Sequence, residues 1–188
     1  MLLVLSLGAC LHLHVPRHIP YRSTIIKVSC HNHVDPRLTA AIIKEESGYH
    51  RYAMKIEKNG DVSRGLMQVE YRTARSLGLR RKPSWLYSPW LNIFYGTKYL
   101  HLLMLKYKNL GDVISAYNAG HPLFNAMHGR YVNRRYVLSV THFYKAYSGL
   151  KIEDPEAYTR LVNGKIANFK RIRRYYGILV DYQRNEFQ

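Results

Sequence analysis

The apolar positions of this chain recur mostly at the three-to-four-residue spacing of helices. In the longest such segment, residues 91–107, the apolar positions that keep this spacing are Leu91, Phe94, Tyr95, Tyr99, Leu102, Leu103 and Tyr107. The alternation of apolar and polar residues that is typical of strands has little support. We therefore expect an all-α, or mainly α, fold built as a compact bundle of six or more helices.

Helix-start and helix-stop residues divide this pattern into elements. Asp35-Pro36 begins a helix that contains Leu38 and Ile42 and ends at Gly48. Residues 49–64 are polar and contain Asn59-Gly60, which predicts an irregular loop or a small hairpin. Further helices are predicted over about 70–77, 91–107, 112–119, 130–147, 154–163 and 168–183.

The composition fits one domain with a buried core and a strongly basic surface. The chain has 188 residues, of which 47% are hydrophobic, and its 29 Lys and Arg residues outweigh 12 Asp and Glu residues to give a net charge of +17. This balance excludes an acidic solvating protein and indicates a polyanionic partner, such as nucleic acid, an anionic membrane or a bacterial wall. Eighteen of the basic residues lie in residues 35–150, so the charge is spread over the predicted core. Because no base-reading motif accompanies it, no specific nucleic-acid partner is expected.

One true basic cluster lies near the C-terminus. It consists of Lys170, Arg171, Arg173 and Arg174. The cluster is interpreted either as a solvated helix face or as a contact with an anionic membrane or wall polymer.

The N-terminus resembles a secretion signal. An apolar stretch from Met1 to Gly8 is followed by Leu7-Gly8-Ala9-Cys10, which is similar to a bacterial lipobox, although no basic residue precedes it. The alternatives are an N-terminal strand or helix of the domain, and a disulfide between Cys10 and Cys30.

The same region is rich in histidine. The residues are His12, His14, His18, His31 and His33. No carboxylate or thiolate spacing supports a metal site among them, so no metal is expected.

Four segments carry the candidate chemistry. They are Glu46-Ser47-Gly48; Gly65-Leu66-Met67-Gln68-Val69; Asn92, Gly96, Thr97, Tyr99 and Leu100; and Ala116-Tyr117-Asn118-Ala119-Gly120 with Tyr136-Val137 downstream. In this order and spacing they resemble the soluble lytic transglycosylase (SLT) domain of the lysozyme-like superfamily, over about residues 33–147. The predicted organisation is therefore an N-terminal extension (1–32), a catalytic domain (33–150) and a basic helical extension (151–188).

The resemblance implies a lysozyme-like fold and a lytic enzyme. Such enzymes cleave the β-1,4 bond between N-acetylmuramic acid and N-acetylglucosamine in peptidoglycan without hydrolysis. One glutamic acid protonates the bond and then takes the proton of the sugar's own 6-hydroxyl, which leaves a 1,6-anhydro end. No cofactor is implied, and the expected location is the cell envelope or periplasm, with a phage virion as the alternative.

Glu46 is the predicted catalytic acid. A carboxyl group late in a helix, in line with Leu38 and Ile42, is expected to be partly desolvated, which raises its pKa toward the range of a general acid. Helical spacing alone barely separates Glu46 from Glu45. The Glu-Ser-Gly context of the family favours Glu46.

The resemblance also suggests the substrate-binding residues. They are Ser47, Gly65, Met67, Gln68, Tyr117, Asn118 and Tyr136. Ordinary packing is the alternative role for Met67 and Gln68, and a tie between helices is the alternative for Asn118. Tyr131 is a competing match for Tyr136.

Two other functions fit the same motifs. A goose-type lysozyme would use a second acid, Asp61 or Glu57, to hold a hydrolytic water. A non-catalytic wall-binding or virion structural protein would keep the fold without the reaction, but the retained Glu46, Gln68 and Tyr117 argue against it.

Overall fold

The computed structural model describes residues 15–57, 59–107 and 109–148. The described helices are α2 (Arg22–His31), α3 (Pro36–Ser47), α4 (Tyr71–Ser76), α5 (Pro89–Lys106), α6 (Leu110–Ala119) and α7 (Arg134–Ser148), with a 3₁₀ helix η1 (Pro83–Tyr87). The strands are β1 (Met54–Ile56), β2 (Val62–Arg64), β3 (Val69–Glu70), β4 (Phe124–Asn125) and β5 (Arg130–Tyr131). The predicted mainly helical fold class is confirmed.

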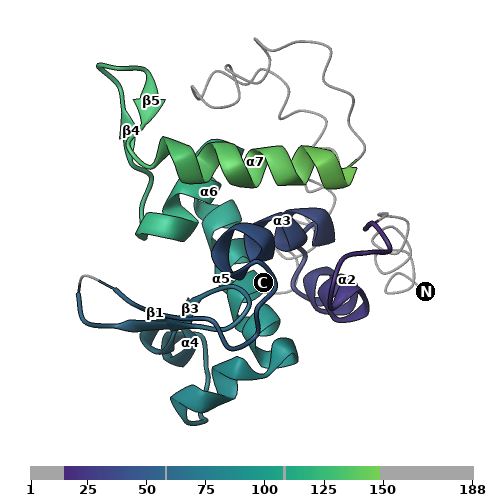
Figure 1. Cartoon of the computed structure of the whole chain (residues 1–188). Coiled ribbons are helices and arrows are strands. Elements are labelled where there is room, and N and C mark those ends of the chain that lie inside the picture. Colours follow the sequence, from purple (N-terminus) through teal and green to yellow (C-terminus); the bar gives the residue numbers. More distant parts are fainter. Residues whose placement is uncertain (1–14, 58, 108, 149–188) are drawn as a thin grey trace, which may run out of the picture.

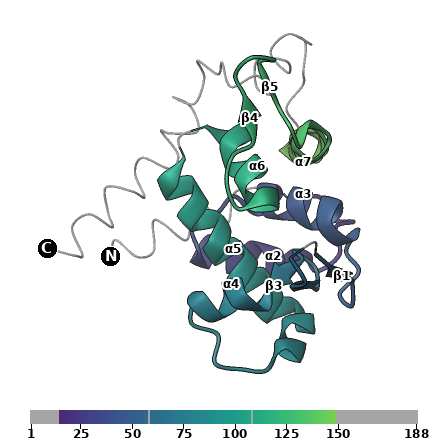
Figure 2. The same ribbon diagram turned by 90° about the vertical axis from the view of Figure 1, so that its left-hand side faces the viewer.

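Helix α5 runs through the middle of the bundle and packs against α2 and α6 (Figure 1). Helix α3 lies side by side with α7 on one face and contacts α2 on the other. The strands β1 to β3 form a separate layer beside α4 (Figure 2). The core between these elements is apolar and includes the fully buried Leu38, Ile42, Ile93, Leu100 and Ile114.

Helix α3 has the boundaries that its sequence predicts. The Asp35 carboxylate accepts a hydrogen bond of 2.8 Å from the backbone N–H of Arg37, and Pro36 occupies the first turn. At the other end Gly48 adopts a left-handed conformation with φ 57°, which ends the helix. Glu46 therefore lies in the last turn of α3.

The segment 49–64 folds as the predicted small hairpin. Strand β1 pairs antiparallel with β2, with Met54 opposite Arg64 and Lys55 opposite Ser63. Strand β2 then pairs with β3, which places Ser63 opposite Glu70. The strands have only two or three residues each, too few for a periodic pattern to be read from sequence.

The starts of helices α6 and α7 differ from the prediction. Helix α6 begins two residues earlier than expected, because Asn109 accepts a hydrogen bond from the N–H of Gly111 and caps the helix. Helix α7 begins at Arg134 instead of 130, because Arg130 belongs to the hairpin β4–β5.

Helix α2 was not predicted. It begins without a side-chain cap after Tyr21, which has a positive φ of 56°, so the usual start signal is missing. Ile25 and Val28 are buried against the rest of the core, and α2 contacts α5. The folded core thus includes a helix that the predicted boundary at residue 33 left in the N-terminal extension.

Several predictions lie outside the described residues. These are the signal-like stretch with Cys10, the helices over 154–163 and 168–183, and the basic cluster at Lys170, Arg171, Arg173 and Arg174. Cys30 is disulfide-bonded, and Cys10, the other cysteine of the chain, is not among the described residues. Among the helices of the described ranges, none has the length and apolar character needed to cross a membrane.

Candidate active site

The centre of the site is a carboxyl group held between two helices. Tyr136 of α7 donates a hydrogen bond of 2.5 Å from its hydroxyl to Oε1 of Glu46, at the end of α3. Burial raises the pKa of Glu46 to about 7, although the Tyr136 hydrogen bond and the charge of Lys55 act to lower it. A carboxyl group with this pKa is protonated in part of the population near neutral pH, as a general acid requires.

Glu45 lies next to Glu46 but has a different partner. Ser139, one turn after Tyr136 on α7, donates a hydrogen bond to Oε2 of Glu45. The negative charge of Glu45 raises the pKa of Glu46 further. The two neighbouring carboxyl groups are therefore both bound to α7. The raised pKa of Glu46 lies in the range of an acid catalyst.

Ser47 connects the acid-bearing helix to the segment that begins at Gly65. Its hydroxyl donates a hydrogen bond of 2.7 Å to the backbone carbonyl of Leu66. Gly65 has a positive φ of 75°, and a Cβ at this position would lie 2.3 Å from Nδ2 of Asn92. Only glycine fits this turn, so Gly65 shapes the segment.

Gln68 and Met67 occupy this segment in different ways. Gln68 is half-buried and has a positive φ of 46°, and its Nε2 donates hydrogen bonds to the carbonyls of Ala53 and Gly65. The side chain of Met67 is fully buried and packs closely against Gly96. Packing, the alternative role that we considered for Met67, therefore describes its side chain better than a sugar-contacting surface does.

Tyr117 reaches the same segment from α6. Its hydroxyl donates a hydrogen bond of 3.0 Å to the backbone carbonyl of Met67. Burial and the nearby charge of Glu46 raise the pKa of the Tyr117 phenol well above its usual value, so it stays neutral and can act as a donor. Tyr117 and Tyr136 thus both lie in the electrostatic environment of Glu46.

Asn118 and Tyr131 have hydrogen-bond partners other than the acid. Asn118 is exposed, and its Oδ1 accepts a hydrogen bond of 3.0 Å from Nδ2 of Asn133. Tyr131 is buried and donates to Asp112, not to Glu46. Of the two tyrosines that compete for one motif position, Tyr136 is the one that contacts the acid.

Asn92 was noticed in the motif but not predicted as a site residue. It is 1% exposed, and its Oδ1 accepts a hydrogen bond of 2.7 Å from the N–H of Met67. Its Nδ2 donates to the carbonyls of Arg64 and Leu86. A polar residue at a core position of an apolar helix is the sequence signal that could have identified this support of the 65–68 segment.

The acids considered for hydrolysis are engaged in pairs on the hairpin. Glu57 accepts hydrogen bonds from Lys55 (2.7 Å) and Ser63 (2.8 Å). Burial alone would raise the pKa of Glu57, but these two donors outweigh it, and the pKa is lowered. Asp61 forms an ion pair of 2.7 Å with Arg72. Within the described ranges, no group of three or more His, Cys, Asp and Glu side chains is arranged to hold a metal ion.

Comparisons with known proteins find one family and several relatives of this chain. The profile of the family described as "Transglycosylase SLT domain" matches residues 23–136. Protein IpgF of Shigella sonnei is 32% identical over 85 residues, which are 44% of this chain and 56% of IpgF. X polypeptide of Escherichia coli is 31% identical over 120 residues, which are 63% of this chain and 68% of that protein.

A solved structure shares the fold. It is the lytic transglycosylase Slt of Pseudomonas aeruginosa, an inactive E503Q mutant, with a TM-score of 0.52 and 22% identity. The match covers 69% of this chain and 24% of that one, so the chain spans about a quarter of the solved enzyme and about half of IpgF. The chain belongs to the transglycosylase SLT domain family and has its lysozyme-like helical fold.

Proposed function

We propose that the chain is a peptidoglycan lytic transglycosylase that leaves 1,6-anhydro-N-acetylmuramic acid ends. The observation that carries this proposal is the carboxyl group of Glu46, which has a pKa of about 7 and accepts a hydrogen bond from Tyr136. Ordinary glycosidases use two carboxyl groups on either side of the bond. The hairpin acids Glu57 and Asp61 are occupied by Lys55 and Arg72, which favours a reaction that needs one acid.

The proposed reaction uses Glu46 twice. Its carboxylic acid gives a proton to the glycosidic oxygen as the bond to the anomeric carbon breaks. The resulting carboxylate, stabilised by the Tyr136 hydroxyl, then takes the proton of the 6-hydroxyl of the same sugar. The 6-oxygen bonds to the anomeric carbon, and this intramolecular attack replaces the attack of water.

The substrate is proposed to lie along the segment 65–68 and the ends of α3 and α6. Gln68, Tyr117 and Asn118 supply polar groups, while Ser47 and Gly65 fix the backbone that the sugar meets. Met67 contributes through its backbone, since its side chain is buried.

The proposed setting is the bacterial cell envelope, where this substrate is found. A contact of Lys170, Arg171, Arg173 and Arg174 with an anionic polymer remains part of this proposal and depends on residues outside the described ranges. A lipid anchor at Cys10 would need a free thiol, whereas Cys30 is disulfide-bonded and Cys10 is the other cysteine of the chain, so the anchor is left out of the proposal.

The proposal is tested by digesting purified peptidoglycan and weighing the released fragments. Anhydro ends identify a transglycosylase, reducing ends identify a lysozyme, and no release by the wild type contradicts both enzymes and favours a binding protein. Glu46→Gln should lose activity and keep the fold.

Asp61→Asn separates the two enzyme reactions. In a transglycosylase it should change the rate little, because Asp61 serves the ion pair with Arg72. In a goose-type lysozyme that uses Asp61 to hold water, the same substitution should abolish activity.

A further inference from the structure

The two faces of the β1–β2 hairpin carry different side chains. Cross-strand partners project to the same face of a sheet, so Lys55 and Ser63 share one face. The charge of Lys55 lowers the pKa of Glu46, and we take this face as the one directed toward the acid. Arg64 and Val62, which are paired with Met54 and Ile56, project from the opposite face.

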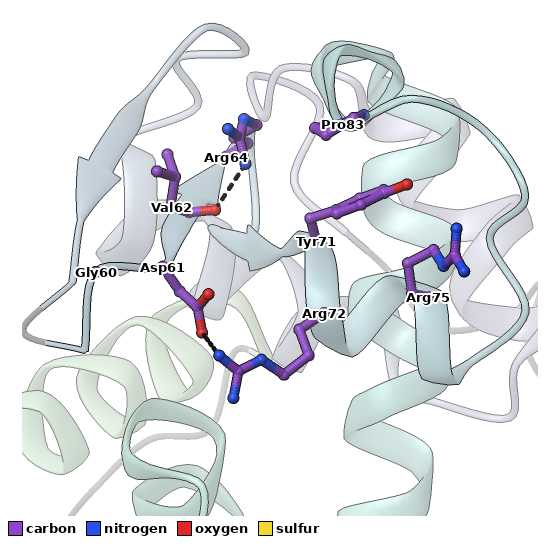
Figure 3. A pocket seen from close by; sticks show the side chains of 8 residues that line it. All are labelled: Gly60, Asp61, Val62, Arg64, Tyr71, Arg72, Arg75 and Pro83. Atoms are coloured by element: carbon purple, nitrogen blue, oxygen red, sulfur yellow. Dashed lines mark hydrogen bonds and ion pairs between the residues drawn. The ribbon is translucent and has the colours of Figure 1, made fainter.

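A pocket of about 480 Å³ opens on this opposite face. Its lining residues are Gly60, Asp61, Val62, Arg64, Tyr71, Arg72, Arg75 and Pro83. Figure 3 shows the Tyr71 ring between Arg64 and Pro83 above it and Arg72 below it. Three arginines and one aspartate are among the lining residues, so the lining carries a net positive charge, which attracts anions.

The arginines are held by contacts that leave donors available. Nη1 of Arg64 donates to the carbonyl of Val62, and the guanidinium of Arg75 lies 6.0 Å from the centre of the Tyr71 ring. Arg72 is paired with Asp61, but its side chain is 74% exposed, and such ion pairs contribute little to stability. A guanidinium group has five N–H donors, so each arginine can bind a ligand oxygen without losing its present contact.

The remaining walls of the pocket are apolar. Val62, Pro83 and the Tyr71 ring would leave much of a bare phosphate ion without a hydrogen-bonding partner. A carboxylate on a short aliphatic residue fits better, because its oxygens match the planar guanidinium groups and its carbon atoms contact the apolar wall.

We propose that this pocket binds the carboxylate of a peptide stem carried by the glycan strand, so that the enzyme prefers peptide-bearing wall. This inference rests on the proposed function. The glycan would lie on the Lys55 face beside Glu46, and the stem would pass round the hairpin to Arg64 and Arg75. Four extended residues span up to about 14 Å, whereas stacked layers in proteins lie about 10 Å apart, so a short stem has the reach.

The test compares two forms of one substrate. Purified wall is used as isolated or after an amidase has removed its peptide stems, and rates of product release are measured at low substrate concentration. Arg64→Gln/Arg75→Gln should lower the rate on peptide-bearing wall about tenfold and leave the rate on stripped strands within about twofold of wild type. The control, Lys27→Gln/Arg80→Gln, removes two positive charges outside the pocket and should release product from both substrates at the wild-type rate.

Two results of the rate comparison would overturn the proposal. One is an equal loss of rate on both substrates, which would mean that the arginines serve folding or contact the glycan itself. The other is no loss on peptide-bearing wall.

Direct binding separates this inference from the proposed function. A free stem tetrapeptide, titrated into the Glu46→Gln protein, should shift the NMR signals of Tyr71, and adding the substitutions Arg64→Gln/Arg75→Gln should abolish the shift. If inorganic phosphate binds as tightly as the tetrapeptide, the pocket is a general anion site and the proposal is wrong. If the wild type releases nothing from either substrate, the proposed reaction is wrong, while the titration still decides whether the pocket binds the peptide.

Discussion

The raised pKa of Glu46 serves the proposed reaction but lowers the stability of the folded protein above about pH 4.5. Its pKa near 7 arises mainly from burial, which disfavours the ionised form. The Tyr136 hydroxyl limits this effect by donating to the carboxylate. The residue is therefore kept close to the point at which it can both give and take a proton, as the proposed reaction requires.

The activity is expected to fall as the pH rises through about 7. The proton donor is the neutral form of Glu46, and this form is lost above its pKa of about 7. The measurement is the initial rate of fragment release at low substrate concentration between pH 5 and 9, at a constant salt concentration that screens the charge of the wall. A rate that rises to pH 9 would exclude Glu46 as the acid.

Glu46→Gln is expected to stabilise the folded protein at alkaline pH. The pKa of Glu46 is higher in the folded state than the ordinary value of 4.5, so the folded state binds the proton more tightly, and its stability declines as the pH rises from 4.5 through 7. The glutamine variant should therefore exceed the wild type by about 3 kcal/mol at pH 8.5 and by little at pH 4. Urea unfolding at both pH values checks this, and an equal difference at the two would contradict it.

Tyr136→Phe is expected to move the pH profile upward and slow the reaction. Without the hydroxyl the pKa of Glu46 rises further, and the carboxylate formed after proton donation loses its partner, so the rate at pH 6 should fall about tenfold. Tyr131→Phe is the matched control, because it removes a hydrogen bond to Asp112 and should lower stability without shifting the profile. An unchanged profile in Tyr136→Phe would contradict this account of Glu46.

At the scale of the elements, the 65–68 segment depends on the close approach of Gly65 to η1 and α5. A Cβ on Gly65 would lie 2.3 Å from Nδ2 of Asn92 and 2.4 Å from the carbonyl oxygen of Leu86. Gly120 has nearly the same φ, 78° against 75°, but a Cβ there meets nothing within 4 Å.

The two glycines form a matched pair for measurement. Gly120→Ala should cost about 1 kcal/mol for the left-handed conformation alone. Gly65→Ala should cost about 3 kcal/mol more, because it also displaces Asn92 and the backbone that Asn92 supports. Urea unfolding gives the loss of stability in each variant. Equal losses would show that the protein accommodates a Cβ at Gly65 without displacing Asn92.

The elements also show what the sequence could predict. Helix α3 was placed correctly because Asp35, Pro36 and Gly48 are local signals that act within one turn. Helix α2 was missed because it lacks a side-chain cap at its start. The hairpin β4–β5 was missed because its strands have two residues each, too few to give an alternating pattern in the sequence. Glu46 and Tyr136 were predicted through a family resemblance, whereas the contact between Ser139 and Glu45 depends on how α7 packs on α3 and has no signature in the sequence.

At the scale of the whole molecule, the net charge of +17 should govern association with the wall. Peptidoglycan and its attached polymers carry carboxylates and phosphates, and salt screens their attraction to a basic protein. Raising the salt concentration from 0.05 to 0.5 M should weaken binding of the Glu46→Gln protein to purified wall at least about fivefold. Co-sedimentation measures this, and binding that is insensitive to salt would assign the affinity to uncharged contacts of the glycan with the 65–68 segment.

The contact between Glu46 and Tyr136 joins residues 90 positions apart in the chain. Tyr49 and Tyr147 meet across the same two segments, and so do Asp35 and Tyr144. Contacts between residues this far apart in the chain form late in folding, because a long stretch of chain must be ordered before these contacts can stabilise it. The raised pKa of Glu46 therefore exists only in the folded protein. An unfolded chain has a glutamate of ordinary acidity, so the proposed cleavage could begin only where the chain has folded.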